Sequence, residues 1–339
     1  MLTLSIEDPR WSSFVAGSPD ASPFHHPVWA NLLSRCYGYR AMALVITDEV
    51  GDIRAGLPII EVGGPLTGRR WVSLPFTDYC PLLVDGRSIR EVSGALVDEL
   101  RGNRIQALEL RAHLPSGPRV HSYADAVRHT TVLGDDPGEV YARFSRMHQR
   151  NIRKAERASV RVERSRSPHA MQEFYRLHLL TRRRLGVPVQ PFRFFRLLLD
   201  QMVEADLGFV LVARVNGEPA AAAVFLTWNG TMIYKYGASD PAYWDSRPNN
   251  LLFWQAIGWG CEHGYHTFDW GRTDLEDQGL RQFKDGWGAE GRPLSYSVIA
   301  DTPPRESQHR MHRAVEAVIK PSPIWVCRAI GELFYKYSA

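Results

Sequence analysis

The sequence has no long apolar run, no metal-ligand motif and no glycine-rich phosphate motif. No stretch approaches the roughly 18 unbroken apolar residues of a membrane-spanning helix. The N-terminal residues carry an acidic pair and no apolar core, so we expect no signal peptide. Four cysteines without a CxxC pair and 12 histidines without an HExxH pattern argue against a metal site and a disulfide framework. We therefore expect a cytoplasmic protein without bound metal or tightly bound cofactor.

Charge is spread unevenly along the 339 residues, a length that suits two domains. Residues 143–166 hold nine Arg or Lys against two Glu, a net charge of +7, whereas the whole chain carries +4. The remainder is therefore −3, and the positive charge is local. Such a distribution predicts a face that binds something anionic rather than a generally basic protein.

Hydrophobic periodicity predicts an α/β (α+β) chain in which a meander of strands, a helix and a further strand occur twice. In the first half the predicted elements are helix 28–37, strands 41–47, 53–62, 70–74 and 79–84, helix 88–101 and strand 107–110. In the second half they are helices 168–185 and 191–204, strands 209–215, 220–228 and 231–237, helix 250–263, and strands 267–270 and 294–299. Asn-Gly pairs between the strands of the second meander are strong hairpin signals.

These elements predict two domains and a helical tail. We expect an N-terminal domain at 1–135 and a C-terminal catalytic domain at 136–300, which includes a basic helix at 137–158 that bridges the two. The tail at 301–339 ends in apolar, aromatic and basic residues. Packing on its own domain is the ordinary interpretation, and peripheral attachment to an anionic membrane surface is the alternative.

The basic helix carries its arginines at helical spacing. A solvated charged face is the default for such a run, but a merely soluble helix would mix glutamate with arginine. The guanidinium fork matches phosphate oxygens, so a nucleotide, tRNA or a pyrophosphate-linked precursor is a natural ligand. The residues that share this face are Arg143, Arg146, Arg150, Arg153 or Lys154, and Arg157.

Two further clusters carry polar groups. In YKYGAS (234–239) alternation predicts that Tyr234 and Tyr236 share a face, either at the edge of the core or in contact with substrate. In FDWGRT (268–273), Asp269 and Arg272 come at the carboxyl end of a strand, where open α/β sheets place their ligands. Lys284 is predicted in a short turn between Phe283 and Trp287, where it either snorkels or stabilises an oxyanion.

Several of these segments resemble the Fem family and its FemAB-like relatives. The matching stretches are FHHPVWANLL (24–33), RNIRKAER (150–157), YKYGAS (234–239), RPNNLLFWQAIGWGCEHGYHTFDWGRT (247–273) and GLRQFKDGWGAEGRPLSY (279–296). The resemblance implies two GNAT-like domains, each a mixed twisted sheet with flanking helices. It also implies transfer of an acyl or aminoacyl group to an amine.

The resemblance assigns roles to residues of this sequence. It implies that Lys284 stabilises the tetrahedral intermediate and that Tyr236, or alternatively Tyr234, contacts substrate. Basic residues at Arg150 and after the opening Trp29 would contact an acceptor phosphate, and Arg35 is the nearest match for the second. A first-domain acid corresponds to either Asp78 or Asp85. The expected substrate-binding residues are therefore Tyr236, Tyr234, Arg150, Arg35, Trp29, Arg272 and Asp78.

No Cys or Ser nucleophile with a partner base is visible, so we expect the acceptor amine to attack the donor carbonyl directly. Asp269 or a water chain would take the amine's proton. The +7 segment and the missing glycine-rich loop favour aminoacyl-tRNA as donor over acyl-CoA. A module that only binds nucleic acid or anionic lipid is the remaining alternative. Contact with the inner membrane face through the tail would make the cytoplasmic protein peripheral.

Overall fold

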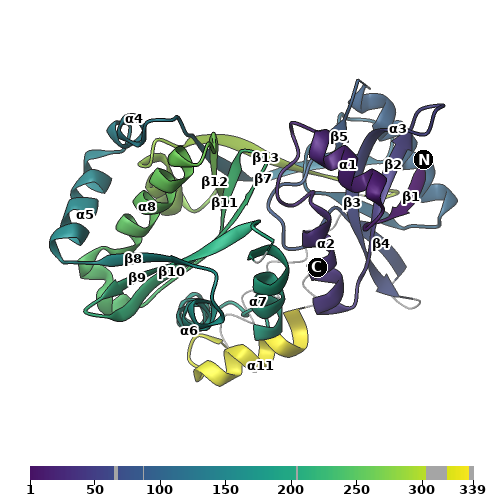
Figure 1. The fold of residues 1–339 in the computed structure, drawn as a ribbon. Coiled ribbons are helices and arrows are strands. Elements are labelled where there is room, and N and C mark those ends of the chain that lie inside the picture. Colours follow the sequence, from purple (N-terminus) through teal and green to yellow (C-terminus); the bar gives the residue numbers. More distant parts are fainter. Residues whose placement is uncertain (65–67, 87, 204, 303–318, 336–339) are drawn as a thin grey trace. The chain divides into compact units, whose positions relative to one another are not determined.

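The computed structural model describes residues 1–64, 68–86, 88–203, 205–302 and 319–335 (Figure 1). Contacts divide the chain into two units. The N-terminal unit comprises Met1–Val127 and Pro293–Arg305, and the C-terminal unit comprises Arg128–Arg292 and Glu306–Ser338. The long strands β7 (Val120–Val132) and β13 (Glu290–Ala300) each contain a boundary between the units.

The N-terminal unit is a mixed sheet with helices on both faces. Its strands follow the order β1-β2-β3-β4-β6-β13, with β5 beside β3. Buried residues of α3 pack against one face, and Trp11 of α1 contacts Gly56 on the other. The elements before β7 are β1 (Leu2–Ser5), α1 (Pro9–Gly17), α2 (Pro27–Tyr37), β2 (Arg40–Thr47), β3 (Ile53–Gly64), β4 (Gly68–Val72), β5 (Leu83–Val84), α3 (Ile89–Gly102) and β6 (Ala107–Leu110).

The C-terminal unit has the strand order β7-β12-β11-β10-β9-β8. Helix α8 covers one face of this sheet and α6 covers the other, and α5 packs against α8. Its elements are α4 (Pro137–Ala142), α5 (Arg146–Arg157), β8 (Arg161–Ser165), α6 (Pro168–Leu185), α7 (Phe192–Leu198), the π-helical turn η1 (Leu199–Val203), β9 (Gly208–Val215), β10 (Glu218–Trp228), β11 (Thr231–Ser239), the 3-10 helix η2 (Pro241–Ser246), α8 (Pro248–Glu262), β12 (Thr267–Asp274), α9 (Gln278–Asp285) and α11 (Ile324–Phe334).

The predicted repetition is confirmed by the topology. In the N-terminal unit the antiparallel meander β2-β3-β4 leads through α3 to β6, which pairs in parallel with β4. In the C-terminal unit β9-β10-β11 leads through α8 to β12, which pairs in parallel with β11. Both predicted Asn-Gly hairpins form, with Asn216, Gly217, Asn229 and Gly230 all at positive φ, as a type I′ turn requires.

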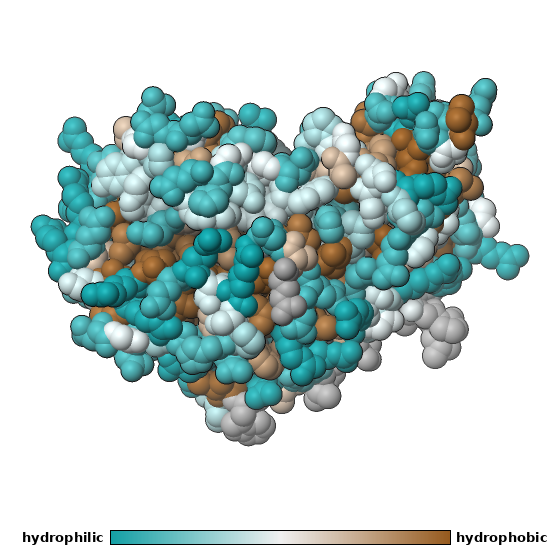
Figure 2. All heavy atoms as spheres, in the orientation of Figure 1, coloured by the Kyte–Doolittle hydropathy of each residue, from teal (hydrophilic) through white to brown (hydrophobic). Residues whose placement is uncertain are grey.

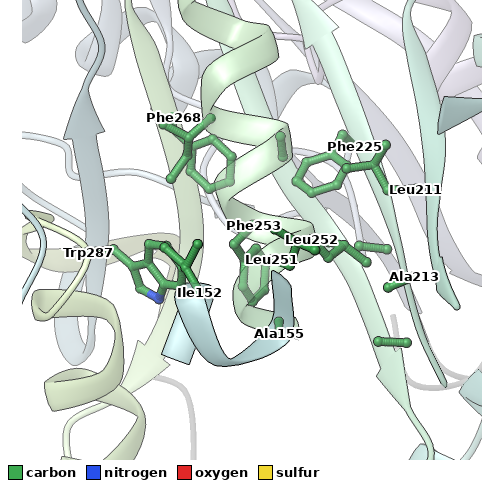
Figure 3. Close-up of a cluster of buried hydrophobic side chains, with 14 of the residues drawn as sticks. Ile152, Ala155, Leu211, Ala213, Phe225, Leu251, Leu252, Phe253, Phe268 and Trp287 are labelled. Carbon is green, nitrogen blue, oxygen red and sulfur yellow. The ribbon is translucent and has the colours of Figure 1, made fainter. Parts of the chain in front are cut away.

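The core of the C-terminal unit lies between its sheet and the helices α5 and α8. Figure 3 shows side chains from these elements meeting in one cluster. Phe225 and Phe268 come from the sheet, Phe253 from α8 and Ile152 from α5, and all are buried. Trp287, which follows α9, joins the same cluster and is fully buried. Helix α5 therefore packs against α8 through its buried residues, and its charged residues are on the other side.

The prediction of one bridging helix at 137–158 was wrong. The chain forms two helices, α4 and α5, which both belong to the C-terminal unit. The break occurs because the Ser145 hydroxyl accepts a hydrogen bond from the N–H of His148 and begins a new helix there. The units also differ from the predicted bounds: 128–135 lies in the C-terminal unit, and 293–300 lies in the N-terminal unit.

The described part of the tail packs on the C-terminal unit. Helix α11 contacts α6, and Gly331 approaches Val189 so closely that a Cβ there would lie 1.9 Å from the Val189 carbonyl oxygen. Residues 303–318 and 336–339 lie outside the described residues, so membrane contact through the tail stays a prediction. Across the described ranges, no helix combines the length and the apolar character that crossing a membrane would need.

Within the N-terminal unit, a fully buried histidine holds the segment that precedes α2 against the segment that precedes β5. The Nε2 of His25 donates to the Pro81 carbonyl at 2.8 Å, and Nδ1 accepts from the Ser22 N–H at 3.0 Å. Burial lowers the pKa of His25 to about 4. The imidazole is thus neutral in the folded protein at physiological pH.

We expect the folded state to lose stability as the pH falls from 6.5 to about 4, because unfolded His25 takes up a proton in this range and folded His25 does not. The contribution is about 1.4 kcal/mol per pH unit, or about 3 kcal/mol over the window. Urea unfolding at pH 7 and at pH 4.5 measures it. The variant His25→Asn should show a smaller difference between the two pH values, and equal differences in variant and wild type would contradict the assignment.

Candidate functional site

Strands β11 and β12 pair in parallel only at their beginnings, through Thr231–Ile233 and Thr267–Asp269. Beyond this point β11 contains a bulge, because Phe225 of β10 pairs with Tyr234 and the preceding Val224 pairs with Tyr236. Lys235 is the extra residue. Bulges of this kind redirect side chains and are frequent beside functional sites. The carboxyl ends of β11 and β12 are therefore where the regular sheet pairing stops.

The bulge overturns the prediction that Tyr234 and Tyr236 share a face. Tyr234 packs in the core beside α8, with its ring centroid 4.9 Å from that of Phe253, and burial raises its pKa to about 12. Tyr236 is buried on the opposite face, where its ring contacts Phe195 of α7 and His178 of α6. One inserted residue shifts the alternation by one position and sends the two rings to opposite sides.

Lys284 lies in the last turn of α9 rather than in the predicted short turn. The helix forms because the Asp277 side chain accepts from the Leu280 N–H at 3.0 Å and caps its first turn. The Lys284 side chain is buried, and Nζ donates to the carbonyl oxygens of Gly271 and Arg272, each at 3.1 Å. Its positive charge is thereby fixed at the carboxyl end of β12.

Asp269 is buried two residues before Gly271 on β12, and both of its carboxylate oxygens accept hydrogen bonds. One carboxylate oxygen accepts from Arg128 Nε at 2.8 Å and forms an ion pair with the same guanidinium at 2.7 Å. The other oxygen accepts from the Gly271 N–H at 2.7 Å. Both oxygens are engaged, so the structure supports Asp269 as a residue that positions the Gly271 backbone.

Arg128 and His129, which sequence reasoning missed, lie on β7 in the same cluster. His129 is buried; its Nε2 lies 3.4 Å from an Asp285 carboxylate oxygen, and Nδ1 lies 3.5 Å from the Thr273 hydroxyl. Burial, and then the nearby charge of Lys284, lowers the pKa of His129. Strand β7 reads as VHSYADAVRHTTV, without the apolar alternation that would have revealed it.

The segment around Lys284 is docked on helix α5 through His148. The imidazole is stacked on Trp287 at 4.3 Å, and its Nε2 donates to the Phe283 carbonyl at 2.9 Å. Its Nδ1 accepts from the side-chain amide of Asn250, at the start of α8, at 2.9 Å. Burial lowers the pKa of His148, which keeps the ring neutral in this role. Two segments of the resemblance, 247–273 and 279–296, thus meet at one side chain of α5.

The other side of α5 presents the predicted basic face. Arg146, Arg150, Arg153 and Arg157 are all exposed, whereas Lys154 forms an ion pair with Asp245 at 2.5 Å. Hydrophilic side chains cover this part of the molecule in Figure 2, at the left where Figure 1 labels α5. Of the other predicted residues, Arg272 forms an ion pair with Asp274 at 2.6 Å. No group of three or more His, Cys, Asp or Glu placed to hold a metal ion is found among the residues that the structure describes.

The remaining predicted residues lie in the N-terminal unit. Trp29 is fully buried and donates from Nε1 to the Thr77 hydroxyl at 3.1 Å, so its visible role is in packing. Arg35 is exposed in the last turn of α2. Asp78 is half-buried, and its carbonyl accepts from the Tyr296 hydroxyl at 2.7 Å. Asp85 is exposed and forms an ion pair with Arg54 at 2.9 Å.

Asp78 follows a segment in which Leu74 and Phe76 both have φ of 60°. A positive φ is uncommon for bulky residues and persists only where the surroundings hold it. Here the hydroxyl of Thr77 accepts from Trp29, and the next segment is held by His25 through Pro81. Of the two candidate acids, Asp78 thus lies in a strained, fixed segment, whereas Asp85 lies in an exposed ion pair.

Comparison with known proteins agrees with this architecture. Residues 142–285 match the acetyltransferase (GNAT) domain family. The crystal structure of FemX, 15% identical, covers 93% of this chain and all of its own with a TM-score of 0.70. A tandem GNAT protein from the clavulanic acid biosynthesis pathway, 14% identical, covers 90% of this chain and 99% of its own with a TM-score of 0.55. The chain therefore has the tandem GNAT fold.

Curated relatives match part of this tandem GNAT protein. A lipid II:glycine glycyltransferase from Staphylococcus haemolyticus (strain JCSC1435) is 33% identical over 89 residues, which are 24% of this chain. A protein of the same name from Staphylococcus epidermidis is 30% identical over 92 residues. The chain spans only about a fifth of the length of these relatives, 21% and 22% respectively. The predicted family resemblance and tandem fold are confirmed.

The contact between α5 and the Lys284 segment predicts the effect of one glycine substitution. A Cβ at Gly286 would lie 2.7 Å from ring atoms of His148 and 3.1 Å from the Ser145 hydroxyl. We expect Gly286→Ala to lower the free energy of unfolding by about 1–3 kcal/mol, because the well-packed ring must move. Thermal or urea unfolding measures this loss.

The control is Gly258→Ala, in the interior of α8. A Cβ at Gly258 would meet no atom within 4 Å, so this substitution should stabilise the protein by roughly 0.5–1 kcal/mol. Equal stability of the two variants would contradict the packing described for Gly286.

Proposed function

We propose that this protein transfers an aminoacyl or acyl group from an activated donor to an acceptor amine and forms an amide. The observation that carries the proposal is the buried ammonium of Lys284, fixed at the carboxyl end of β12 by two backbone carbonyls. A fixed cation in a water-poor site is suited to stabilise an oxyanion, because it needs no reorganisation when the charge develops. Similarity to glycyltransferases supports the same reaction class.

In the proposed reaction the amine nitrogen attacks the donor's ester or thioester carbonyl. The new C–N bond forms a tetrahedral intermediate, whose oxyanion is stabilised by Lys284, and the bond to the donor's oxygen or sulfur then breaks. The amine loses one proton and the leaving group gains one. Because both oxygens of Asp269 are engaged, we assign it a positioning role and propose that neutral His129 or water carries the proton.

For the donor, we propose aminoacyl-tRNA. Helix α5 presents an exposed basic face that matches a phosphate backbone. The connection from β11 to α8 is the 3-10 helix η2 and lacks a glycine-rich loop. Acyl-CoA is the second candidate, because residues 142–285 match an acetyltransferase domain.

For the acceptor, we propose an amine-bearing precursor that contains phosphate, with Arg150 as a phosphate contact. Arg35 and Asp78 are the proposed acceptor residues of the N-terminal unit. Because charged tRNA is a cytoplasmic substrate, we propose that the reaction takes place in the cytoplasm. The donor is a co-substrate in this scheme and not a tightly bound cofactor.

The oxyanion role of Lys284 predicts that Lys284→Met lowers kcat by roughly 100- to 1,000-fold, because the stabilising charge is lost while the donor still binds. Single-turnover formation of the amide from charged tRNA and a simple amine measures the chemical step. Lys284→Arg, which keeps the positive charge, should retain more activity than Lys284→Met. A kcat for the methionine variant within a few-fold of wild type would remove Lys284 from the reaction.

The basic face predicts how RNA binding responds to salt. Replacing Arg146, Arg150 and Arg157 together by glutamine should weaken tRNA binding. It should also make the plot of log K against log salt shallower by about 1 for each lost phosphate contact. Arg90→Gln, on an exposed position of α3, is the control and should change neither quantity. An unchanged slope in the triple variant would mean that tRNA does not bind to this face.

A further inference from the structure

An exposed arginine is stacked on the ring of an exposed tryptophan near the end of β11. Trp244, in η2, is 39% exposed, and the guanidinium carbon of Arg184 lies 4.9 Å from the centroid of its ring. Arg184 is itself exposed, in the last turn of α6. We call the two side chains together the Trp244–Arg184 platform. Neither residue was singled out by sequence reasoning.

The platform is rigid, which separates it from an ordinary exposed tryptophan. The indole Nε1 of Trp244 donates to the Ser239 hydroxyl at 2.9 Å. Ser239 is tied in turn to α6, because its N–H donates to the Thr181 hydroxyl at 3.0 Å. Thr181 and Arg184 are three residues apart and share a face of α6. One helix thus supplies both the anchor of the tryptophan and the cation stacked on it.

The platform lies at the same edge of the sheet as Lys284. Ser239 is the last residue of β11, and the carbonyls that hold Lys284 belong to β12, its parallel neighbour. From the register, which pairs Ile233 with Asp269, Ser239 lies roughly 10 Å further along the strand direction than those carbonyls, at about 3.3 Å per residue. Along the strand direction, the platform and the carbonyls that hold Lys284 are therefore neighbours at one edge of the sheet.

A flat aromatic ring beside a guanidinium binds a nucleobase by stacking, and the cation suits the adjoining phosphate. Both candidate donors end in adenosine, but they differ in the distance from adenine to the reactive carbonyl. In aminoacyl-tRNA a single ribose separates the two. In acyl-CoA the pyrophosphate and the whole pantetheine arm lie between them. The short separation in the structure fits the former.

We propose that the Trp244–Arg184 platform stacks on the 3′-terminal adenine of aminoacyl-tRNA and so places the ester carbonyl beside Lys284. This inference rests on the proposed function and deepens it, because it assigns a subsite to one nucleotide of the donor. The basic face of α5 binds the phosphate backbone of the tRNA, and the platform binds the 3′ end of the tRNA.

The test compares an RNA hairpin that ends in CCA with the same hairpin lacking the terminal adenosine. Binding is measured by fluorescence anisotropy of the labelled RNA. For the wild type, removal of the adenosine should weaken binding by about 5- to 150-fold, the range expected for one stacked base. Trp244→Leu should weaken binding of the CCA hairpin by a similar factor and leave the shortened hairpin unaffected. Trp244→Phe, which keeps an aromatic ring, should lie between.

A matched control exists in the same unit. The guanidinium carbon of Arg164 also lies 4.9 Å from the ring centroid of a tryptophan, Trp259, but that pair involves β8 and the last part of α8. Arg184→Met should reduce the difference in affinity between the CCA hairpin and the shortened hairpin, whereas Arg164→Met should leave this difference unchanged. Unfolding temperatures of all variants identify any loss that is due to misfolding.

The outcomes separate the two proposals. If the terminal adenosine contributes equally in wild type and Trp244→Leu, the platform assignment is wrong, while tRNA remains the donor. If Trp244→Leu instead weakens binding of coenzyme A and leaves the CCA end unaffected, the platform binds the adenine of the other donor and the inference is overturned. If the wild type binds neither hairpin but transfers from acyl-CoA, the proposed donor is wrong and the platform assignment is rejected with it.

Discussion

A buried ammonium group needs oxygen atoms around it, and the candidate site depends on how this chain meets that need. Desolvating a charge is costly unless hydrogen bonds compensate it. Lys284 is compensated by two backbone carbonyls of β12, which are accessible where regular pairing with β11 has stopped. The carbonyls are held in turn by Asp269, which accepts from the Gly271 N–H and is itself neutralised by Arg128. The position of one cation is thus set by strand geometry and by a second, buried ion pair.

The same segment links the site to the basic helix. His148 donates to the Phe283 carbonyl, accepts from Asn250 and stacks on Trp287, so it joins α5, α8 and the residues after α9. Because a neutral imidazole has one donor and one acceptor, both of its nitrogens are satisfied only in this arrangement. The basic face of α5 and Lys284 are thereby fixed with respect to each other within one unit.

Much of the fold was predictable because its signals are local. The Asn-Gly hairpins, the amphipathic helices α3 and α6 and the repeated order of elements follow from turn chemistry and periodicity. The errors arise where a single residue changes the pattern. Lys235 as a bulge reverses the direction of Tyr236, and Ser145 as a cap divides one basic helix into two. His129 could not be found, because its strand is polar and its neighbours come from distant parts of the sequence.

Strand β13 determines when the sheet of the N-terminal unit can be completed during synthesis. It pairs with β6 in the N-terminal unit, yet it is synthesised only after nearly all of the C-terminal unit. On the ribosome, the N-terminal unit therefore cannot complete its sheet when its first 127 residues have emerged: the sheet lacks an edge partner until about 300 residues have emerged. Until then β6 presents unpaired backbone groups, the kind of edge on which nascent chains aggregate. The segment that closes the N-terminal sheet thus also determines how long the nascent protein needs protection.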